Sequence, residues 1–320
     1  MTAKEFIEKR LNALKSPGKT VAPFKSDKEL ADFIFQTIVS KKFRKFSIDP
    51  KTKDVIRTAI DLNIKNNEPI KFVIPFGSYK LWRFEEESPE VDWAELFVMI
   101  YYTHWLKPIT DVYKPGVWFD FCGDDAILEL MNNIPPEDTE IYKKGFRSLI
   151  NFIQPFLPDN FKFTFSPVGE RYASKEEFLA DLNNRTEELK DKELSPLTER
   201  QIEMMKFNIK IKEGEEIDIE NNRLLHDAFM GVSKRRSYHK TPDKISVCCT
   251  PFGGTSLPVG TTKTSVVKFQ TGVGVLKRKE DSLIEYIFSP SQLKSASFVK
   301  EEISIKGLDS KNFKSIRVLS

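Results

Sequence analysis

The sequence predicts an α/β protein with a Rossmann-like, mainly parallel sheet that is flanked by helices. Three short apolar runs, Ile70–Ile74, Val117–Cys122 and Phe161–Phe165, are rich in the aromatic and β-branched residues that favour buried strands. Long helical patterns separate these runs, as the crossovers between parallel strands require. We therefore expect the three strands to lie in one parallel sheet, with helices packed on its faces.

An N-terminal helical segment, residues 1–66, precedes the first strand. Apolar residues recur there at helical spacing in two stretches, and Asp49-Pro50 is a typical start for a third helix. Residues 67–250 are assigned to an α/β catalytic core. Within this core, helices are predicted from about Asp92 to Ile109 and from about Asp138 to Phe156.

The pattern changes after Lys244, where glycine, proline and serine break the chain into short strand-like pieces. Because no crossover helices lie between these pieces, they favour an antiparallel extension of the sheet. Residues 251–320 are thus expected to form a C-terminal β-rich extension packed on the core. The predicted pieces are Lys244–Thr250, Thr264–Phe269, Gly274–Arg278, Ser282–Phe288 and Ile303–Ile305.

Composition and charge exclude several classes of protein. The 50 Lys and Arg residues nearly balance the 47 Asp and Glu residues, so the chain lacks the basic excess of a general nucleic-acid binder. Its three cysteines lack metal-binding spacing and its three histidines lie far apart, so no metal site is expected. With no apolar secretion signal and no run of about 18 apolar residues, the chain is predicted to be soluble, cytoplasmic and without a membrane segment.

One glycine-rich stretch, GGTSLPVGTTKTS at 253–265, does not fit a phosphate-binding loop. The Walker pattern G-x-x-x-x-G-K-[ST] places its lysine directly after the second glycine. Here five residues lie between Gly254 and Gly260, and Lys263 comes later. A strand is expected next, which leaves no helix N-terminus to hold a phosphate. We therefore expect a flexible loop there, and no cofactor.

Cations and aromatic residues follow the first predicted strand, in IKFVIPFGSYKLWR at 70–83. Ligands of open α/β sheets bind outside the carboxyl ends of the strands. Lysine and arginine beside flat aromatic walls suit the phosphate or carboxylate of an organic molecule. Alternatively, the cations pair with Glu85–Glu87 at the surface and the aromatic residues cap the core. The candidate residues are Ser78, Tyr79, Lys80, Trp82 and Arg83.

Two acidic pairs are predicted near the same edge of the sheet. Asp92 and Glu95 open the long helix, and Asp124 and Asp125 directly follow the second strand. Each pair has a structural alternative, since Asp92 with Glu95 matches a capping box and either aspartate of the second pair suits an N-cap. If the two strands are parallel, residues 78–83 and the second pair emerge at one edge, where we expect them to form one anion-binding cleft.

The basic stretch KRRSYHK at 234–240 contains a candidate acid/base, His239. The surrounding cations are expected to lower the pKa of His239, so that its imidazole is neutral at pH 7 and able to accept a proton. The alternative is a solvated basic turn. His226 is expected to be a packed or surface residue of a helix, and His104 a core residue.

Several of these segments, in order across residues 70–280, resemble the isonitrile (isocyanide) synthase family of pyoverdine and dityrosine biosynthesis. That family shows a Lys-Ser-Pro-Asn segment after a strand, a Leu-Pro-Asp-Leu-Gly-Glu helix start, a Pro-Pro-Gly turn and a strand ending in Ser-Asp-Gly-Arg. The corresponding segments are Pro75-Phe-Gly-Ser-Tyr-Lys80, Pro89-Glu-Val-Asp-Trp-Ala-Glu95, Lys114-Pro-Gly116, Phe119-Asp-Phe-Cys-Gly-Asp-Asp125, Ile134-Pro-Pro-Glu-Asp-Thr-Glu-Ile-Tyr142, Arg235-Arg-Ser-Tyr-His239 and Lys244-Ile-Ser-Val-Cys248. Three positions depart from the pattern. Ala126 replaces the arginine of Ser-Asp-Gly-Arg, the first lysine is shifted, and Lys263-Thr-Ser-Val-Val267 lacks the histidine of a Thr-Pro-Trp-His segment.

The resemblance implies an enzyme of secondary metabolism. Such enzymes join the amine of an aromatic amino acid to a carbonyl of ribulose 5-phosphate and form an N≡C group without a metal or redox cofactor. An iron/2-oxoglutarate oxygenase is implied as a downstream partner in the same pathway. The implied catalytic residues are His239 as acid/base, with Asp92 and Glu95 holding the ammonium group or moving protons. The implied substrate-binding residues are Lys80 and Arg83 for the anion, Asp124 for sugar hydroxyls, Tyr79 and Trp82 for the aromatic group, and Ser78, Asp125, Arg235 and Arg236.

Two other functions fit the same sequence. The chain could instead be a different Rossmann-like transferase, one that acts on a phosphorylated small molecule. It also matches a non-catalytic small-molecule-binding or interaction protein, in which the charged helical stretch 174–230 supplies the contact surface. Stabilisation by ribulose 5-phosphate, aromatic amino acids or nucleotides in a thermal-shift screen would separate these functions.

Overall fold

The structure is a computed structural model that describes most of the chain. Among the predicted site residues, only Ser78 lies outside the described part. The residues not described are 17, 19–21, 45, 78, 85, 191, 193–195, 212–213, 215, 250–254, 261–265 and 320, together with the side chains of 266 and 267.

The strands of the first three quarters of the chain are separated by one or more helices. The strands are β1 Ile70–Phe76, β2 Val117–Gly123, β3 Phe161–Phe165, β4 Lys244–Cys248, β5 Leu257–Pro258, β6 Val273–Lys279, β7 Ser282–Phe288, β8 Phe298–Glu302 and β9 Ser315–Leu319. The α-helices are α1 Ala3–Asn12, α2 Asp27–Ile38, α3 Pro50–Lys65, α4 Trp93–Thr110, α5 Leu128–Asn132, α6 Pro136–Ile153, α7 Lys175–Lys190, α8 Glu199–Asn208, α9 Ile219–Gly231, α10 Ser233–His239 and α11 Pro290–Ser295. The 3₁₀ helices are η1 Lys41–Phe43, η2 Leu81–Arg83, η3 Asp125–Ile127, η4 Gln154–Phe156, η5 Gly169–Arg171, η6 Val266–Thr271 and η7 Lys311–Phe313.

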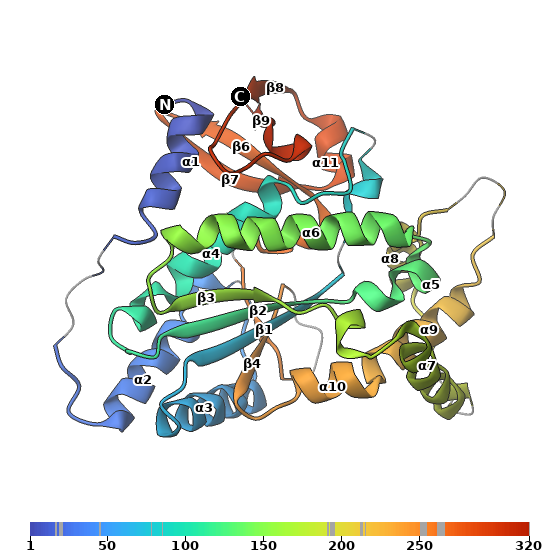
Figure 1. Cartoon of the computed structure of the whole chain (residues 1–320), viewed down its shortest axis with the longest axis horizontal. Coiled ribbons are helices and arrows are strands. Elements are labelled where there is room, and N and C mark those ends of the chain that lie inside the picture. Colours follow the sequence, from blue (N-terminus) through green and yellow to red (C-terminus); the bar gives the residue numbers. More distant parts are fainter. Residues whose placement is uncertain are drawn as a thin grey trace.

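A parallel sheet forms the centre of the molecule, which confirms the predicted fold class (Figure 1). Its five strands lie in the order β3-β2-β1-β4-β5, and each neighbouring pair is parallel. The order of the strands along the chain reverses between β1 and β4, since the chain goes from β1 to β2 on one side and returns to β4 on the other. Such a switch point is where open α/β sheets bind their ligands.

One face of this sheet is covered by α4 and α6. Phe121 of β2 packs on that face against two helices, with ring centroids 6.2 Å from Tyr102 of α4 and 5.1 Å from Phe146 of α6. Nearly the whole circumference of α4 is buried. Its sequence is therefore a nearly continuous apolar run and lacks the polar face of an amphipathic helix.

The opposite face of the sheet carries a second core cluster. Cys122 of β2 packs there with Phe178 of α7 and Phe229 of α9. Tyr238 of α10 also packs against this second cluster, whereas the buried residues of α3 belong to the cluster that contains α4. The helices α7, α9 and α10 therefore form the second helical layer of the core.

The C-terminal strands form a separate sheet on the far side of α4 and α6 (Figure 1). Its order is β7-β6-β9-β8, with β6 antiparallel to β7 and parallel to β9, and β8 antiparallel to β9. The prediction of a β-rich C-terminal region is confirmed. The predicted antiparallel extension of the first sheet is wrong: Lys244–Cys248 joins that sheet as the parallel strand β4, and β6, β7, β8 and β9 share no ladder with it among the described residues.

Two predicted strands in this region are also wrong. The described part of Thr264–Phe269 lies in the 3₁₀ helix η6, and Ile303–Ile305 is irregular. Ile303 and Ile305 are both buried, so their alternating pattern reflects packing without strand pairing. No part of β8 or β9 was predicted, because the mostly exposed FVKEE of β8 carries little apolar signal.

Gly274 of β6 lies against the start of α4, so that this contact joins the second sheet to the core. A methyl group at Gly274 would lie 2.5 Å from the backbone of Trp93 and of Ala94. We expect Gly274→Ala to lower the free energy of unfolding by about 1–3 kcal/mol in a urea titration, since backbone atoms cannot move aside. Gly77→Ala is the matched control, because nothing lies within 4 Å of the added methyl. Equal stability of the two variants would contradict this packing.

No helix within the described parts of the chain has both the length and the apolar character needed to cross a bilayer.

Candidate active site at the carboxyl end of the parallel sheet

The segments that follow β1 and β2 begin side by side. Phe76 at the end of β1 is in register with Gly123 at the end of β2, and the Asp124 backbone N–H donates to the Phe76 carbonyl oxygen at 2.8 Å. The expectation that both segments emerge at one edge of the sheet is thus confirmed.

The side chains at this edge nevertheless separate onto opposite faces of the sheet. Residues in register share a face and alternate along a strand, so Asp120 and Cys122 of β2 face away from α4 and α6, whereas Phe121 faces them. Lys80 lies on the α4 side, where its ammonium is 6.0 Å from the ring of Phe269, which itself packs on Phe121.

Asp124 lies on the other side, where it binds Arg235 of α10. The expectation that Lys80 and Asp124 line one shared cleft is therefore wrong. Each belongs to its own group of charged residues, with the sheet between the two groups.

Lys80 is the centre of a buried ionic network on the α4 side. Its Nζ donates to Asp92 Oδ1 at 3.2 Å, to Glu95 Oε1 at 2.6 Å and to the carbonyl oxygen of Phe269. Glu95 Oε1 also accepts from the Tyr142 hydroxyl at 3.1 Å. Lys80, Asp92 and Glu95 are each no more than 2% exposed. All three ammonium hydrogens thus have acceptors, which leaves Lys80 no donor for a substrate anion.

Asp92 and Glu95 also form the capping box that their spacing predicts. Asp92 Oδ1 accepts from the Ala94 N–H at 3.1 Å, and Glu95 Oε2 accepts from the Asp92 N–H at 2.9 Å. Asp92 Oδ2 accepts from the Gly274 N–H of β6 at 2.8 Å. Burial raises the pKa of Glu95, and the Lys80 ammonium opposes that rise. This network joins the end of β1, the start of α4 and the second sheet.

Asp125 is held in a similar way by its neighbours. Its carboxylate lies 3.3 Å from Lys143 Nζ of α6 and accepts from the Gly169 N–H at 3.0 Å. Burial raises the pKa of Asp125. The side chain therefore ties the end of β2 to α6 and to the segment after β3.

A second group, which we call the His239 cluster, lies between the carboxyl end of β2 and α10. Arg235 binds Asp124 through two nitrogens, with Nε 2.8 Å from Oδ1 and Nη2 3.1 Å from Oδ2. One atom each of Cys122, Asp124 and His239 lies within 4.8 Å of the other two. Arg235 and His239 share a face of α10 because they are four residues apart. The cluster consists of Cys122, Asp124, Arg171, Arg235 and His239, and Lys244, the first residue of β4, is included because it lowers the pKa of His239.

His239 is half-buried, and its two ring nitrogens are buried with their hydrogen-bonding capacity unused. Neither Nδ1 nor Nε2 has a hydrogen-bond partner among the described residues, although a neutral imidazole offers one donor and one acceptor. Burial, together with the smaller effects of Arg235, Arg171 and Lys244, lowers the pKa of His239 to about 3. The predicted direction of the shift is confirmed, while its main cause is burial. Buried polar atoms without partners are rare, so this ring is suited to a ligand.

Two cations of the cluster, Arg171 and Lys244, were not predicted from the sequence. The Arg171 guanidinium lies 3.1 Å and Lys244 Nζ lies 3.5 Å from the ring centroid of Tyr238, whose hydroxyl donates to Asp120 Oδ2 at 2.6 Å. Arg171 lies in η5, in the segment that follows β3. Ligands of open α/β sheets bind at the carboxyl ends of the strands. The same rule, applied to β3 as well as to β1 and β2, would have identified Arg171.

Arg83 is a further, half-buried cation, located where η2 meets α8. Its Nη2 donates to Asn208 Oδ1 at 2.6 Å, and its guanidinium lies 5.1 Å from the ring of Trp82 and 4.7 Å from the ring of Phe207. Nε and Nη1 are buried without a partner among the described residues. Burial lowers the pKa of Arg83 to about 10, so the group stays charged at pH 7. The alternative from the sequence is pairing with Glu85–Glu87; Glu86 and Glu87 pair instead with Arg317, and Glu85 lies outside the described residues.

The remaining candidates lie apart from these groups. Tyr79 is buried, which raises its pKa to about 12, and half-buried Trp82 packs against the main core. Arg236 is exposed on α10. Outside the candidate set, His226 is exposed on α9 as a surface histidine. His104 is half-buried, with Nε2 2.9 Å from Arg10 Nη1.

Cys122, Asp124 and His239 are close enough together to suggest a metal site. Their surroundings favour an anion instead. Both oxygens of Asp124 already accept from Arg235, and Arg171 Nη2 lies 3.8 Å from Cys122 Sγ. Burial raises the pKa of Cys122, which disfavours the thiolate that binds metals. A divalent cation there would also be repelled by the three cations of the cluster.

Comparison with known proteins relates the chain to isonitrile synthases. It is 26% identical over 99 residues to L-tryptophan isonitrile synthase AmbI1 from Fischerella ambigua, a match that covers 31% of this chain and 31% of AmbI1. The chain thus matches about a third of the length of that relative. No protein-family profile matches the chain. The sequence similarity confirms the resemblance to isonitrile synthases that the motifs indicate.

The fold is similar to that of the PvcA protein from Pseudomonas aeruginosa. The TM-score with its crystal structure is 0.59, at 16% identity, and the superposition covers 91% of this chain and 100% of PvcA. At this identity the likeness shows a shared fold.

Proposed function

We propose that the protein is an isonitrile-synthase-like enzyme. Its expected substrates are an aromatic amino acid, which supplies the amine, and ribulose 5-phosphate or a similar sugar phosphate, which supplies the carbonyl carbon. The proposal is supported by the similarity to AmbI1 and by the PvcA-like fold. The single observation that carries it is the neutral imidazole of His239, whose two buried nitrogens have no partner among the described residues and which lies beside three cations.

The first step of such a reaction moves protons between nitrogen and oxygen. The amine nitrogen attacks the carbonyl carbon and gives a carbinolamine, which loses one water to leave an imine. His239 carries two protons in turn from nitrogen to oxygen, the first as the carbinolamine forms and the second to the departing hydroxyl group, so that protons balance and one water leaves. A neutral imidazole is the form that can begin this sequence.

The cations of the His239 cluster would bind the phosphate of the sugar. Arg171, Arg235 and Lys244 all act on the imidazole, because each of them lowers the pKa of His239. A phosphate bound among them would offset their charge and raise the pKa of His239 toward the working pH, where a histidine is most effective as an acid/base. Substrate binding would in this way activate the residue that uses the substrate.

Arg83 would bind the carboxylate of the amino acid. Either of its two unpartnered nitrogens, Nε or Nη1, can donate to a carboxylate oxygen, and the rings of Trp82 and Phe207 beside it offer apolar contact for an aromatic side chain. In this scheme, Lys80, Asp92 and Glu95 hold the scaffold and do not touch substrate, since their polar atoms bind one another.

The test is direct detection of the product by mass spectrometry. We expect purified protein, given L-tryptophan and ribulose 5-phosphate labelled with ¹³C at the carbonyl, to form a compound in which one labelled carbon replaces both amine hydrogens. Omitting either substrate, or heating the protein first, should abolish the product. Absence of any labelled isonitrile with tryptophan, tyrosine and phenylalanine would contradict the proposal. Thermal stabilisation by the sugar phosphate alone would then favour a different transferase.

A further inference from the structure

A separate hollow lies between α2 and α3, away from the His239 cluster. Its volume is about 610 Å³, within the range of about 300–1,000 Å³ that is typical of small-molecule sites. Its apolar wall is formed by Phe35, Val39 and Pro50. None of its lining residues belongs to the His239 cluster or to the Lys80 network.

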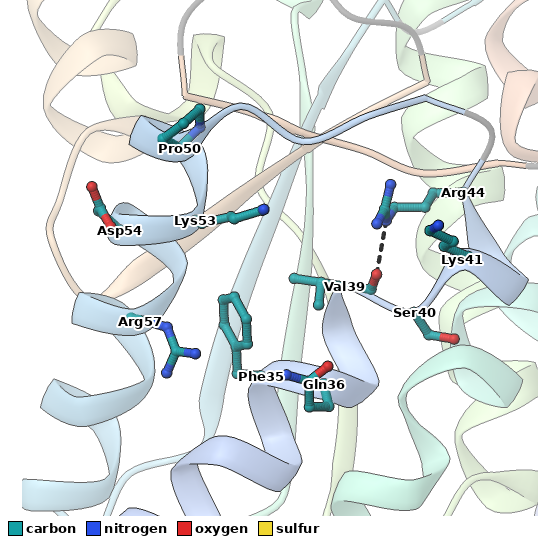
Figure 2. Close-up of a pocket in the computed structure, with 10 residues that line it drawn as sticks. All are labelled: Phe35, Gln36, Val39, Ser40, Lys41, Arg44, Pro50, Lys53, Asp54 and Arg57. Carbon is teal, nitrogen blue, oxygen red and sulfur yellow. Dashed lines mark hydrogen bonds between the residues drawn. The ribbon is translucent and has the colours of Figure 1, made fainter.

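The hollow is lined by an excess of positive charge. Figure 2 shows Lys53 and Arg57 reaching in from α3, and Lys41 and Arg44 on the opposite side. The lining contains one carboxylate, that of Asp54, which points away from the hollow in Figure 2. A concave surface lined by one sign of charge focuses the electrostatic field and attracts the opposite charge.

Three of these cations carry no compensating carboxylate. Arg57 is 3.0 Å from Asp32, whereas Lys41, Arg44 and Lys53 form no ion pair with any residue that the structure describes. Bringing unpaired cations around one hollow costs electrostatic free energy, and a bound anion would remove that cost.

Two of the cations are held in place by the protein itself. Arg44 Nε donates to the Val39 carbonyl oxygen at 2.8 Å and Nη1 to the Phe46 carbonyl oxygen at 2.6 Å. The Arg57 guanidinium stacks 3.9 Å from the centroid of the Phe35 ring. Groups that are fixed before a ligand arrives lose little conformational entropy on binding, so these contacts favour a preformed site over a flexible basic surface.

The hollow lies near the carboxyl edge of the sheet, at its β5 end. A short turn leads from α3 into β1, so the start of α3, where Pro50 and Lys53 lie, is at the carboxyl ends of the strands. The Gly260 N–H, two residues after β5, donates to the Phe43 carbonyl oxygen at 2.7 Å, which places η1 and Arg44 there as well. The N-terminus of α3 adds its partial positive charge.

We propose that this hollow binds a phosphorylated small molecule at a site separate from the His239 cluster. A phosphate ester carries between one and two negative charges near pH 7 and several acceptor oxygens, which suit three uncompensated cations on two sides of a hollow better than a single carboxylate does. The apolar wall of Phe35, Val39 and Pro50 contacts the organic part of the ligand. The inference is independent of the proposed reaction, because it concerns binding alone.

The test measures binding of inorganic pyrophosphate and of ribose 5-phosphate by isothermal titration calorimetry. We expect Lys53→Met to weaken binding of pyrophosphate at least about tenfold, the loss of one charge-assisted contact, and Lys41→Met/Lys53→Met to weaken it further. Lys51→Met is the matched control, because Lys51 is exposed on the same helix but does not line the hollow. Added salt should weaken binding to the natural protein.

Variants of the other site distinguish the two locations. His239→Gln and Lys244→Met should leave one binding event that is sensitive to Lys53→Met. If they abolish binding while Lys53→Met does not change it, the anion binds only in the His239 cluster and the inference is wrong. It is equally overturned if Lys51→Met and Lys53→Met weaken binding to the same extent, or if neither ligand binds at millimolar concentration.

Discussion

Replacement of His239 by glutamine is expected to lower turnover by about 10²- to 10⁴-fold, the usual contribution of a positioned general acid/base. Glutamine keeps hydrogen-bonding capacity and similar volume at this half-buried position but cannot carry the proton. Substrate affinity should change little, because the cations of the His239 cluster remain. Steady-state kinetics with both substrates would show the effect in kcat rather than in KM.

The exposed histidine of α9 offers a matched control. His226→Gln should retain natural turnover, since His226 contacts only its neighbour Asp227 among the described residues. If the His239→Gln variant kept the turnover of the natural protein, His239 would have no role in the reaction. If only KM rose and kcat stayed unchanged, His239 would be a positioning residue.

The same variant tests the electrostatics of the site through the pH dependence of stability. Folded His239 has a pKa of about 3, whereas an unfolded histidine titrates near about 6.5. Between these values the unfolded chain binds more protons, so stability falls as the pH is lowered through that window. The variant should lose less stability than the natural protein between pH 6.5 and pH 4, by up to about 3 kcal/mol. His104, with a pKa lowered to about 4, acts in the same direction in both proteins.

The strands of the core could be predicted because each is a short apolar run between helical patterns. Val117–Cys122 and Phe161–Phe165 lie within one residue of the strands in the structure. The capping box of Asp92 and Glu95 could also be predicted, since both halves of it lie within four residues. Local signals of this kind need no knowledge of distant contacts.

The division of the charged residues into two groups could not be predicted from local signals. Lys80 follows β1 and Asp124 follows β2, but which face of the sheet each side chain joins depends on where α4 and α10 pack. Sequence alternation places Cys122 opposite Phe121 without saying which helices cover either face. The basic hollow between α2 and α3 likewise brings Arg44 and Arg57 together from different elements.

Replacement of Lys80 by methionine is expected to destabilise the fold by about 3–5 kcal/mol, because it leaves two buried carboxylates without their cation. The methionine is similar in length, so packing changes little and the electrostatic loss dominates. Urea and thermal unfolding would measure the change. Lys175→Met is the matched control, since Lys175 pairs with Glu129 at the surface, where such a pair contributes less than about 1 kcal/mol.

A second substitution separates the electrostatic cause from lost packing. Glu95→Gln removes one of the two buried acidic groups that the Lys80→Met variant leaves without a cation, while its amide oxygen can still accept from Tyr142. The double variant Lys80→Met/Glu95→Gln should therefore be more stable than Lys80→Met alone, a coupling that residues in contact show and distant ones do not. If Lys80 instead bound a substrate anion, Lys80→Met would keep its stability and raise KM for the sugar phosphate. That outcome would return Lys80 to the substrate site and place the sheet's α4 face, rather than its α10 face, at the centre of the chemistry.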